Sequence, residues 1–343
     1  MRPSAVAVRA PGRGQLSRRL RPLVVALAGL TPLLMITGCD PLMSHTTGQQ
    51  ITVAAVPGID NANLFLAQHD GYFTKLGLTV KILKYSSVSA EISALTAGTV
   101  NVIAADYGNM FFEQASPNHA DYKVLADGYD AAPGVVEILT LPDSTVKNPD
   151  DLAGLTIPVP NSEPVGVQKG EPGSLALASA VSVLQSDGVN LAAVNWQPMP
   201  QAQEINELVH KQVQAIMVTG TSIYQAQQEG AVELIDACSG PTAGIPLDGF
   251  FATKGWLAEN DNLAAAKAFQ QGIYNADAAA AMPGPIQAVL PRYAGLSKEE
   301  ADLVATGIYP LSTITANIQR TAALMNNEGM TKFDVNVAAM VVR

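Results

Sequence analysis

Few side chains in this sequence are arranged for catalysis or for metal binding. The four histidines, His45, His69, His119 and His210, stand at least 24 residues apart. The sequence has no Walker-type loop, no Gly-x-Ser-x-Gly turn and no Gly-x-Gly-x-x-Gly after a strand. Neighbouring His and Cys residues that would bind a metal are also absent. We therefore expect no catalytic residues, no metal and no cofactor, and a protein that is not an enzyme.

Polar residues instead gather where predicted strands end and predicted helices begin. In open α/β sheets ligands bind at this edge, because helix N–H groups and the helix dipole point into the crevice. The candidates are Asp60, Asn61, Ser86, Ser87, Asp106 and Tyr107 in the first half, Gly173, Ser174, Thr219 and Thr221 in the second, and Asp248 in the segment PLDGF. We expect these residues to bind a ligand. Each could instead cap its own helix, and a capping hydroxyl can also face a ligand.

The elements that position these residues alternate between short β-branched runs and longer runs rich in Ala and Leu. Strands are predicted at 51–56, 78–85 and 100–106, followed by helices at 61–77, 89–98 and 107–115. A second series begins after Pro142, with strands within 151–160, 194–199 and 213–220 and helices at 175–188, 201–212 and 222–230. This alternation is typical of α/β layering with largely parallel sheets.

The two series predict two lobes joined by a double crossover. The extended passages 126–141 and 242–254 would connect the lobes, and the chain is predicted to be mostly helical after Trp256. We expect lobe 1 to comprise 51–135 together with 245–343, and lobe 2 to comprise 136–244. Two parallel-rich sheets flanked by helices would form these lobes.

The charge of the chain argues against several classes of partner. The sequence has 343 residues, with 20 Lys and Arg against 30 Asp and Glu, and six of the arginines lie within 1–39, where no acid occurs. The remainder is therefore strongly acidic, and Coulomb repulsion disfavours nucleic-acid binding. After residue 39 only Arg292, Arg320 and Arg343 could form bidentate contacts with a carboxylate or a sulfonate.

Residues 1–39 have the pattern of a signal peptide. Arginines precede the apolar run 23–36, which at about 1.5 Å per residue is too short to cross a hydrocarbon core of about 30 Å. Ile-Thr-Gly-Cys at 36–39 resembles a bacterial lipobox, and the resemblance implies that Cys39 receives a lipid; an ordinary secretory signal is the alternative. Residues 40–50 would form a tether. With Cys39 lipidated, Cys238 would be a lone, buried thiol.

Several motifs resemble one group of importer proteins. The matching residues are Gly71-Tyr72-Phe73 with Gly77-Leu78, Ala94-Leu95 with Ala97-Gly98 and Val100, and Asp151-Leu152 with Gly154. They are similar to motifs of the periplasmic solute-binding proteins of the nitrate, sulfonate and thiamine-pyrimidine-precursor group of ABC importers, over about 51–329. Asn101, Leu155 and Asp261 depart from the pattern, because the group commonly has Asp, Lys and Pro there.

The resemblance implies a type II periplasmic-binding-protein fold, in which two lobes close around a ligand by a hinge motion. It also implies an extracytoplasmic receptor, anchored by the lipid on Cys39 to the outer side of the cell membrane. Such a receptor would deliver a small molecule to an ABC permease and its ATPase. We expect it to be a monomer.

The charge of the candidate site narrows the ligand. Asp60, Asp106 and Asp248 would oppose an anion if they face the ligand. This favours a neutral or cationic ring compound, such as a thiamine-related pyrimidine, with Tyr107, Trp196 or Phe250 as a stacking surface.

Three other functions remain open from the sequence. The chain could be a receptor for a sulfonate or nitrate anion, or a ligand-sensing surface lipoprotein. It could also be an enzyme similar to the pyrimidine synthase of thiamine biosynthesis. That activity uses a cysteine cluster for iron, and this sequence has none.

Overall fold

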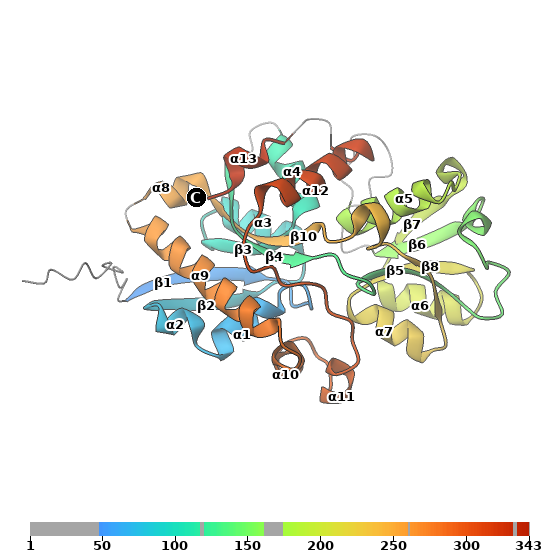
Figure 1. Ribbon diagram of the computed structural model, residues 1–343, viewed down its shortest axis with the longest axis horizontal. Helices are drawn as coiled ribbons and strands as arrows, with labels where there is room; N and C mark the ends of the chain where they lie inside the picture. Colours follow the sequence, from blue (N-terminus) through green and yellow to red (C-terminus); the bar gives the residue numbers. More distant parts are fainter. Residues whose placement is uncertain (1–47, 117–119, 161–173, 260, 332–334, 343) are drawn as a thin grey trace, which may run out of the picture. The chain divides into compact units, whose positions relative to one another are not determined.

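The strands form three sheets in the computed structural model, which describes residues 48–116, 120–160, 174–259, 261–331 and 335–342 (Figure 1). The largest has the strand order β2-β1-β3-β10-β4. Its members are β1 (Gln49–Ala55), β2 (Leu78–Lys84), β3 (Val102–Asp106), β4 (Tyr122–Asp130) and β10 (Pro246–Thr253). β1 pairs in parallel with β2 and β3, so these three strands end at the same edge. β10 runs antiparallel to β3 and β4.

The second half of the chain supplies two smaller sheets. One has the order β8-β5-β9 and consists of β5 (Val136–Thr140), β8 (Ala215–Thr219) and β9 (Val232–Asp236). The other is the parallel pair β6 (Thr156–Pro160) and β7 (Asn195–Met199). β5 runs antiparallel to both of its neighbours. The predicted α/β class is confirmed, but the described strands form three sheets instead of the two parallel-rich sheets expected, and the β8-β5-β9 sheet has only antiparallel pairs. The antiparallel strands β5 and β10 come directly after the two connections between the sheets.

Those two connections are the predicted double crossover. The chain leaves the five-stranded sheet after β4 and returns to it at β10. The two connecting segments bond to each other, because the N–H of Ala131 donates to the carbonyl of Ile245 at 2.8 Å and the N–H of Gly244 donates to the carbonyl of Ala131 at 3.2 Å. The division into lobes at 135 and 245 stays a prediction.

Helices pack on the sheets (Figure 1). The first half contains α1 (Ala62–His69), α2 (Tyr72–Lys75), α3 (Val88–Thr96) and α4 (Tyr107–Ala115), and the second half contains α5 (Leu175–Ser186), α6 (Gln201–Val209) and α7 (Thr221–Gln228). After β10 follow α8 (Lys254–Ala258), α9 (Asn262–Ala280), α10 (Pro285–Val289), α11 (Lys298–Ala301), α12 (Thr315–Asn327) and α13 (Val337–Met340). Of these helices, α4, α6, α7 and α8 follow a strand with no more than one residue between strand and helix. The single helix predicted over 61–77 is wrong: Gly71, with φ of 70°, separates α1 from α2.

Several predictions concern the amino-terminal part of the chain and the two cysteines. The proposed signal peptide 1–39, Cys39 and most of the tether 40–50 lie outside the described residues, and β1 already begins at Gln49. Cys238 is buried just after β9, as expected, and burial raises the pKa of its thiol to about 12. No helix in the described ranges is both long enough and apolar enough to span a membrane.

Candidate ligand-binding site

A cavity of about 280 Å³ lies where strand ends meet helix starts. The five-stranded sheet contributes the loop after β1, the loop after β2, the end of β3 and part of β10. The second half of the chain contributes the starts of β5, α5, α6 and α7. β1, β2 and β3 are parallel, so their carboxyl ends deliver polar residues to one edge, which is the arrangement expected from the sequence.

Seven of the predicted site residues line this cavity. They are Asp60, Ser86, Ser87, Asp106, Thr219, Thr221 and Asp248. Asp248 and Asp106 are directly paired residues of β10 and β3, which explains how residues 142 positions apart come together. Two of the seven also cap helices. Ser87 Oγ accepts the N–H of Ala90 at 3.3 Å, and Asp106 Oδ1 accepts the N–H of Asn109 at 2.9 Å.

Three of the predicted residues do not line the cavity. Tyr107 is fully buried, and its hydroxyl donates to Asp127 Oδ1 at 3.2 Å inside the core. Asn61 is buried, and its side chain donates to the carbonyl of Val56 and so shapes the loop behind the cavity. Ser174 caps α5 by accepting the N–H of Leu177 at 3.0 Å. Gly173 lies outside the described residues.

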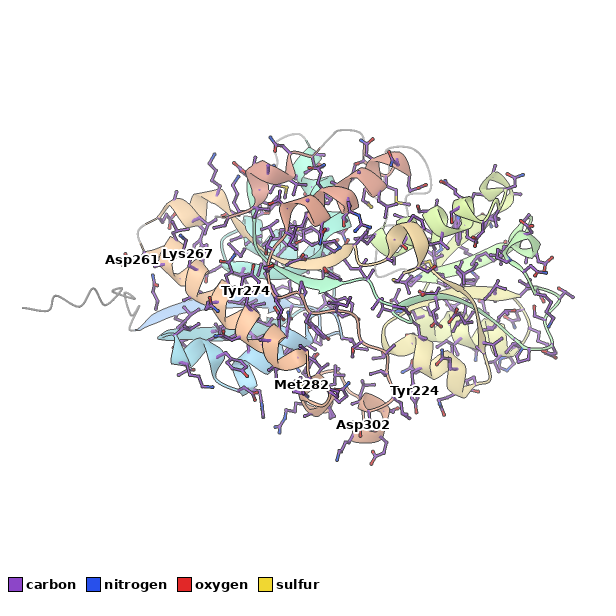
Figure 2. The ribbon with its side chains drawn as sticks, viewed as in Figure 1. Tyr224, Asp261, Lys267, Tyr274, Met282 and Asp302 are labelled. Atoms are coloured by element: carbon purple, nitrogen blue, oxygen red, sulfur yellow. The ribbon has the colours of Figure 1, made fainter. Side chains whose placement is uncertain are left out.

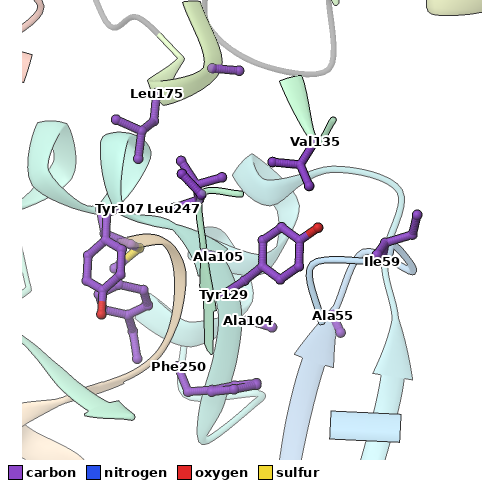
Figure 3. Close-up of a cluster of buried hydrophobic side chains, with 14 of the residues drawn as sticks. Ala55, Ile59, Ala104, Ala105, Tyr107, Tyr129, Val135, Leu175, Leu247 and Phe250 are labelled. Carbon is purple, nitrogen blue, oxygen red and sulfur yellow. The ribbon is translucent and has the colours of Figure 1, made fainter. Parts of the chain in front are cut away.

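The three aromatic residues predicted as stacking surfaces do not line the cavity either. Figure 3 shows Tyr107 and Phe250 among buried apolar side chains. Trp196 packs against the core from β7 and is absent from the cavity lining. The aromatic ring in the lining is instead Tyr129 of β4. A position in the middle of an extended passage gave no sequence signal for this role, because alternating residues of a strand point to opposite faces and the register was unknown.

Two tyrosines from the helical carboxyl-terminal part hold the loop that carries Asp60. The hydroxyl of Tyr293 donates to the carbonyl of Gly58 at 2.8 Å, and the hydroxyl of Tyr309 donates to the carbonyl of Ile59 at 2.6 Å. The ring of Tyr293 also stacks on Phe65, with ring centroids 3.7 Å apart. The loop is therefore fixed by contacts more than 200 residues away in sequence, which is why sequence analysis missed them.

The segment between α11 and α12 supports β4 from behind. The hydroxyl groups of Tyr274, on α9 (Figure 2), and Thr313 lie 2.7 Å apart in a hydrogen bond. Thr313 Oγ1 also accepts the N–H of Asp127 at 2.8 Å. Further along, the N–H of Gly307 donates to the hydroxyl of Tyr129 at 2.6 Å. The cavity wall formed by β4 is thus held by partly buried hydrogen bonds.

The cavity is acidic. Among the described lining residues Asp60, Asp106 and Asp248 are ionisable acids, and none is Lys or Arg. Burial raises the pKa of Asp60 to about 6, the charge of Asp106 adds to the shift, and backbone N–H groups oppose it. Burial also raises the pKa of Asp106, against the hydrogen bonds from Asn109. Both shifts have the direction expected of carboxyl groups withdrawn from water without a neighbouring cation.

A fourth carboxyl lies behind this wall. Glu91 on α3 is fully buried, and neither of its carboxyl oxygens has a hydrogen-bond partner among the described residues. Burial and the charges of Asp60 and Asp106 raise the pKa of Glu91 to about 9, while the nearby amide of Val56 opposes the shift without completing a hydrogen bond. Glu91 is therefore protonated at neutral pH.

Two other hollows do not have these features. One of about 490 Å³ runs along α3 between Ser89 and Ala97, and one of about 280 Å³ lies between α4 and α13. Neither collects residues from several strand ends. Within the described part of the chain no group of His, Cys, Asp and Glu side chains is arranged to hold a metal ion.

Gly58 allows the carboxylate of Asp60 to lie over the loop. A Cβ atom at this position would stand 2.0 Å from Asp60 Oδ1 and 3.1 Å from Asp60 Cγ. We expect Gly58→Ala to displace the carboxylate, to weaken binding of an N–H-bearing ligand by about tenfold, and to change stability little, because a side chain and not the backbone gives way. Titration calorimetry and melting of the ligand-free protein measure the two effects. An unchanged dissociation constant would show that Asp60 does not contact the ligand.

Comparison with proteins of known structure first defines the class. The alkanesulfonate-binding protein SsuA from Xanthomonas axonopodis pv. citri, bound to MOPS, matches with a TM-score of 0.64 and 17% identity, over 87% of this chain and 99% of that one. The periplasmic nitrate-binding protein NrtA from Synechocystis PCC 6803 matches with a TM-score of 0.64 and 12% identity, over 85% and 84% of the two chains. The fold is that of the periplasmic binding proteins.

The family follows from the sequence itself. The model of the family described as NMT1/THI5 like matches residues 59–284, which is more than half of the chain. The chain belongs to the NMT1/THI5-like family. The predicted resemblance to solute-binding proteins of ABC importers is thereby confirmed at the level of family and fold. No curated protein matches the sequence.

One expectation from the sequence is overturned by a further likeness. A mutant of DszB in complex with biphenyl-2-sulfinic acid matches with a TM-score of 0.66 and 12% identity, over 86% of this chain and 96% of that one. A second structure of DszB is described as that of a desulfurization enzyme. The expectation of a protein that is not an enzyme is therefore corrected, because this fold also supports an enzyme.

Proposed function

We propose that this protein is the extracytoplasmic substrate-binding component of an ABC importer. In this proposal the two parts of the chain close around a small solute in the cavity, and the closed form is recognised by a membrane permease and its ATPase. The lipid on Cys39 would anchor the protein to the outer side of the cell membrane as a monomer. Support comes from the family, from the fold and from polar residues that both halves contribute to one cavity.

We further propose that the ligand is a neutral or cationic ring compound, such as a thiamine-related pyrimidine. The acidic lining carries this proposal. Asp60, Asp106 and Asp248 offer oxygen acceptors to the N–H groups of an amine or an aminopyrimidine, and Tyr129 offers a ring. No described Lys or Arg lines the cavity to balance an anion.

A receptor for an anion is the second candidate, because SsuA and NrtA are named for sulfonate and nitrate binding. Helix N-termini at the cavity would favour such a ligand. The carboxyl groups oppose it, because an ionised carboxylate carries a whole negative charge and a helix end only about half a positive unit.

Thermal-shift measurements on the purified protein separate the two candidates. The probes are an aminopyrimidine, thiamine, an alkanesulfonate and nitrate, each at a range of concentrations. A bound ligand at a hundredfold excess over its dissociation constant should add about 2.7 kcal/mol of stability. A shift with the aminopyrimidine or thiamine supports the cationic site. A shift with the alkanesulfonate or nitrate alone would replace it by the anion receptor.

A further inference from the structure

The cavity has two walls of different chemical character. The wall from the five-stranded sheet, here called the acid wall, carries Asp60, Asp106 and Asp248. The wall from the second half of the chain, here called the amide wall, is formed by Leu175 and Ala176 at the start of α5 and by Gly220 and Thr221 at the start of α7. Among the described residues no charged side chain from the second half lines the cavity.

The amide wall presents the backbone N–H groups of Leu175, Ala176 and Thr221, whereas the N–H of Gly220 already donates to the carbonyl of Val135 at 3.3 Å. The first N–H groups of a helix have no partner within the helix. In α5 the hydroxyl of Ser174 accepts the N–H of Leu177. This cap does not use the N–H groups of Leu175 and Ala176, which belong to the amide wall. In α7 the N-cap is Gly220, which has no side chain to accept a hydrogen bond, and its φ of 56° is a backbone conformation that favours glycine.

Two carboxyl groups of the acid wall have no cationic partner among the described residues. None of the ion pairs formed by described residues includes Asp60 or Asp106. Directly behind them lies Glu91, buried and without a hydrogen-bond partner for either carboxyl oxygen among the described residues. Glu91 is protonated at neutral pH and adds no charge, so the acid wall owes its negative charge to its aspartates. Asp60 and Asp106 line the same cavity, no described Lys or Arg lines it with them, and a bound cation would stabilise this arrangement.

We infer that the ligand is dipolar, with a protonated amine or a similar N–H-bearing cation on the acid wall and an oxyanion on the amide wall. This inference rests on the proposed function and specifies its substrate class. A carboxylate, sulfonate or phosphate group would fit the amide wall, because all three accept several N–H groups at a helix start. A ligand with one charge alone satisfies one wall and leaves the other desolvated without a partner.

Three matched ligands test the inference on the purified full-length protein. Butylamine, 4-aminobutanoate and butanoate share a carbon skeleton and carry only the cation, both charges or only the anion. Shorter and longer sets, from three to six carbons, cover the unknown distance between the walls. We expect the amino acid of the best-fitting length to bind at least about tenfold more tightly than its amine and its acid.

The other outcomes overturn one or both proposals. If the amine binds as tightly as the amino acid in every set, or the acid binds most tightly, the ligand is not dipolar. If none of these probes binds while an aminopyrimidine without an oxyanion does, the dipolar ligand is excluded and the importer receptor stands. If no probe and no aminopyrimidine, sulfonate or nitrate binds, the proposed function fails together with this inference.

Variants of Thr221 and Asp60 assign the two ends of the ligand. Thr221→Pro removes one backbone N–H at the first position of α7, where proline is compatible with the helix, and Thr221→Ala keeps that N–H as the matched control. We expect the proline variant to bind the amino acid about tenfold more weakly than wild type and to bind the amine as wild type does. The alanine variant should bind both as wild type does. Asp60→Asn should weaken binding of the amino acid and of the amine but not binding of the acid. Equal losses for amine and amino acid in Thr221→Pro would refute the amide wall.

Discussion

Replacing Glu91 or Glu204 by Gln should stabilise the protein in mildly alkaline solution and leave its stability unchanged near pH 4. Both side chains are fully buried, Glu91 on α3 and Glu204 on α6, and none of their four carboxyl oxygens has a hydrogen-bond partner among the described residues. Burial is the main cause that raises the pKa of each to about 9, with charges of Asp60 and Asp106 acting on Glu91 and the charge of Glu207 acting on Glu204.

The sign follows from proton linkage. Between pH 4.5, the ordinary pKa of a glutamate, and about 9, the unfolded chain has lost the proton that the folded protein retains. The free energy of unfolding therefore falls as pH rises, by about 1.4 kcal/mol per pH unit for each residue. Glutamine cannot ionise, so each variant lacks one such loss. Urea unfolding at several pH values between about 4 and 8 measures this difference. The free energy of unfolding of each variant should exceed that of wild type by an amount that grows with pH and reaches roughly 2–4 kcal/mol at the alkaline end.

Asp121→Asn is the control of opposite sign. Burial alone would raise the pKa of Asp121, but hydrogen bonds from Lys123 and Lys254 outweigh burial and lower this pKa. The asparagine variant should therefore lose a small amount of stability above about pH 4 and leave the alkaline slope as in wild type, because exposed ion pairs contribute little. Parallel curves for wild type, Glu91→Gln and Glu204→Gln would show that both glutamates ionise freely in the folded protein.

Much of the candidate site was accessible from sequence, because local rules place residues at strand ends. Asp60, Ser87 and Asp106 each follow a β-branched run and precede a helix, and parallel strands bring such residues to one edge. The same rule could not distinguish residues facing the cavity from those facing the core. Asn61 and Tyr107 are neighbours of true lining residues, and their side chains turn to Val56 and to Asp127 instead.

The residues that sequence analysis missed depend on contacts that no local pattern encodes. Tyr293 and Tyr309 lie in the helical carboxyl-terminal part, and they bond to the backbone of the loop after β1. Gln201 is the first residue of the predicted helix 201–212 and of α6, and it lines the cavity, where its side-chain oxygen accepts the N–H of Thr219 at 2.8 Å. Tyr293 and Tyr309 lie between helices, where no periodic pattern applies. For Gln201, helical periodicity predicts the faces of α6 but not the partner of each face. The antiparallel direction of β5 could not be predicted either, because it depends on which strands β5 pairs with, and the sequence does not show that.

Gly307→Ala should strongly destabilise the segment that supports β4 behind the cavity. A Cβ atom there would stand 2.5 Å from Cζ of Tyr129 and 2.6 Å from the carbonyl oxygen of Asp130, so it overlaps both a packed ring and the backbone of β4. The Gly307 N–H also donates to the Tyr129 hydroxyl, and any shift of either residue breaks this bond. We expect a loss of about 1–3 kcal/mol or more, together with weaker ligand binding because Tyr129 lines the cavity.

Gly255→Ala on α8 is the matched control, since its nearest atom would be 4.0 Å away and alanine favours the helix. Urea unfolding should show Gly255→Ala at or above wild-type stability and Gly307→Ala well below it. Equal stability of the two variants would mean that β4 can shift to accept the added Cβ atom without loss of stability.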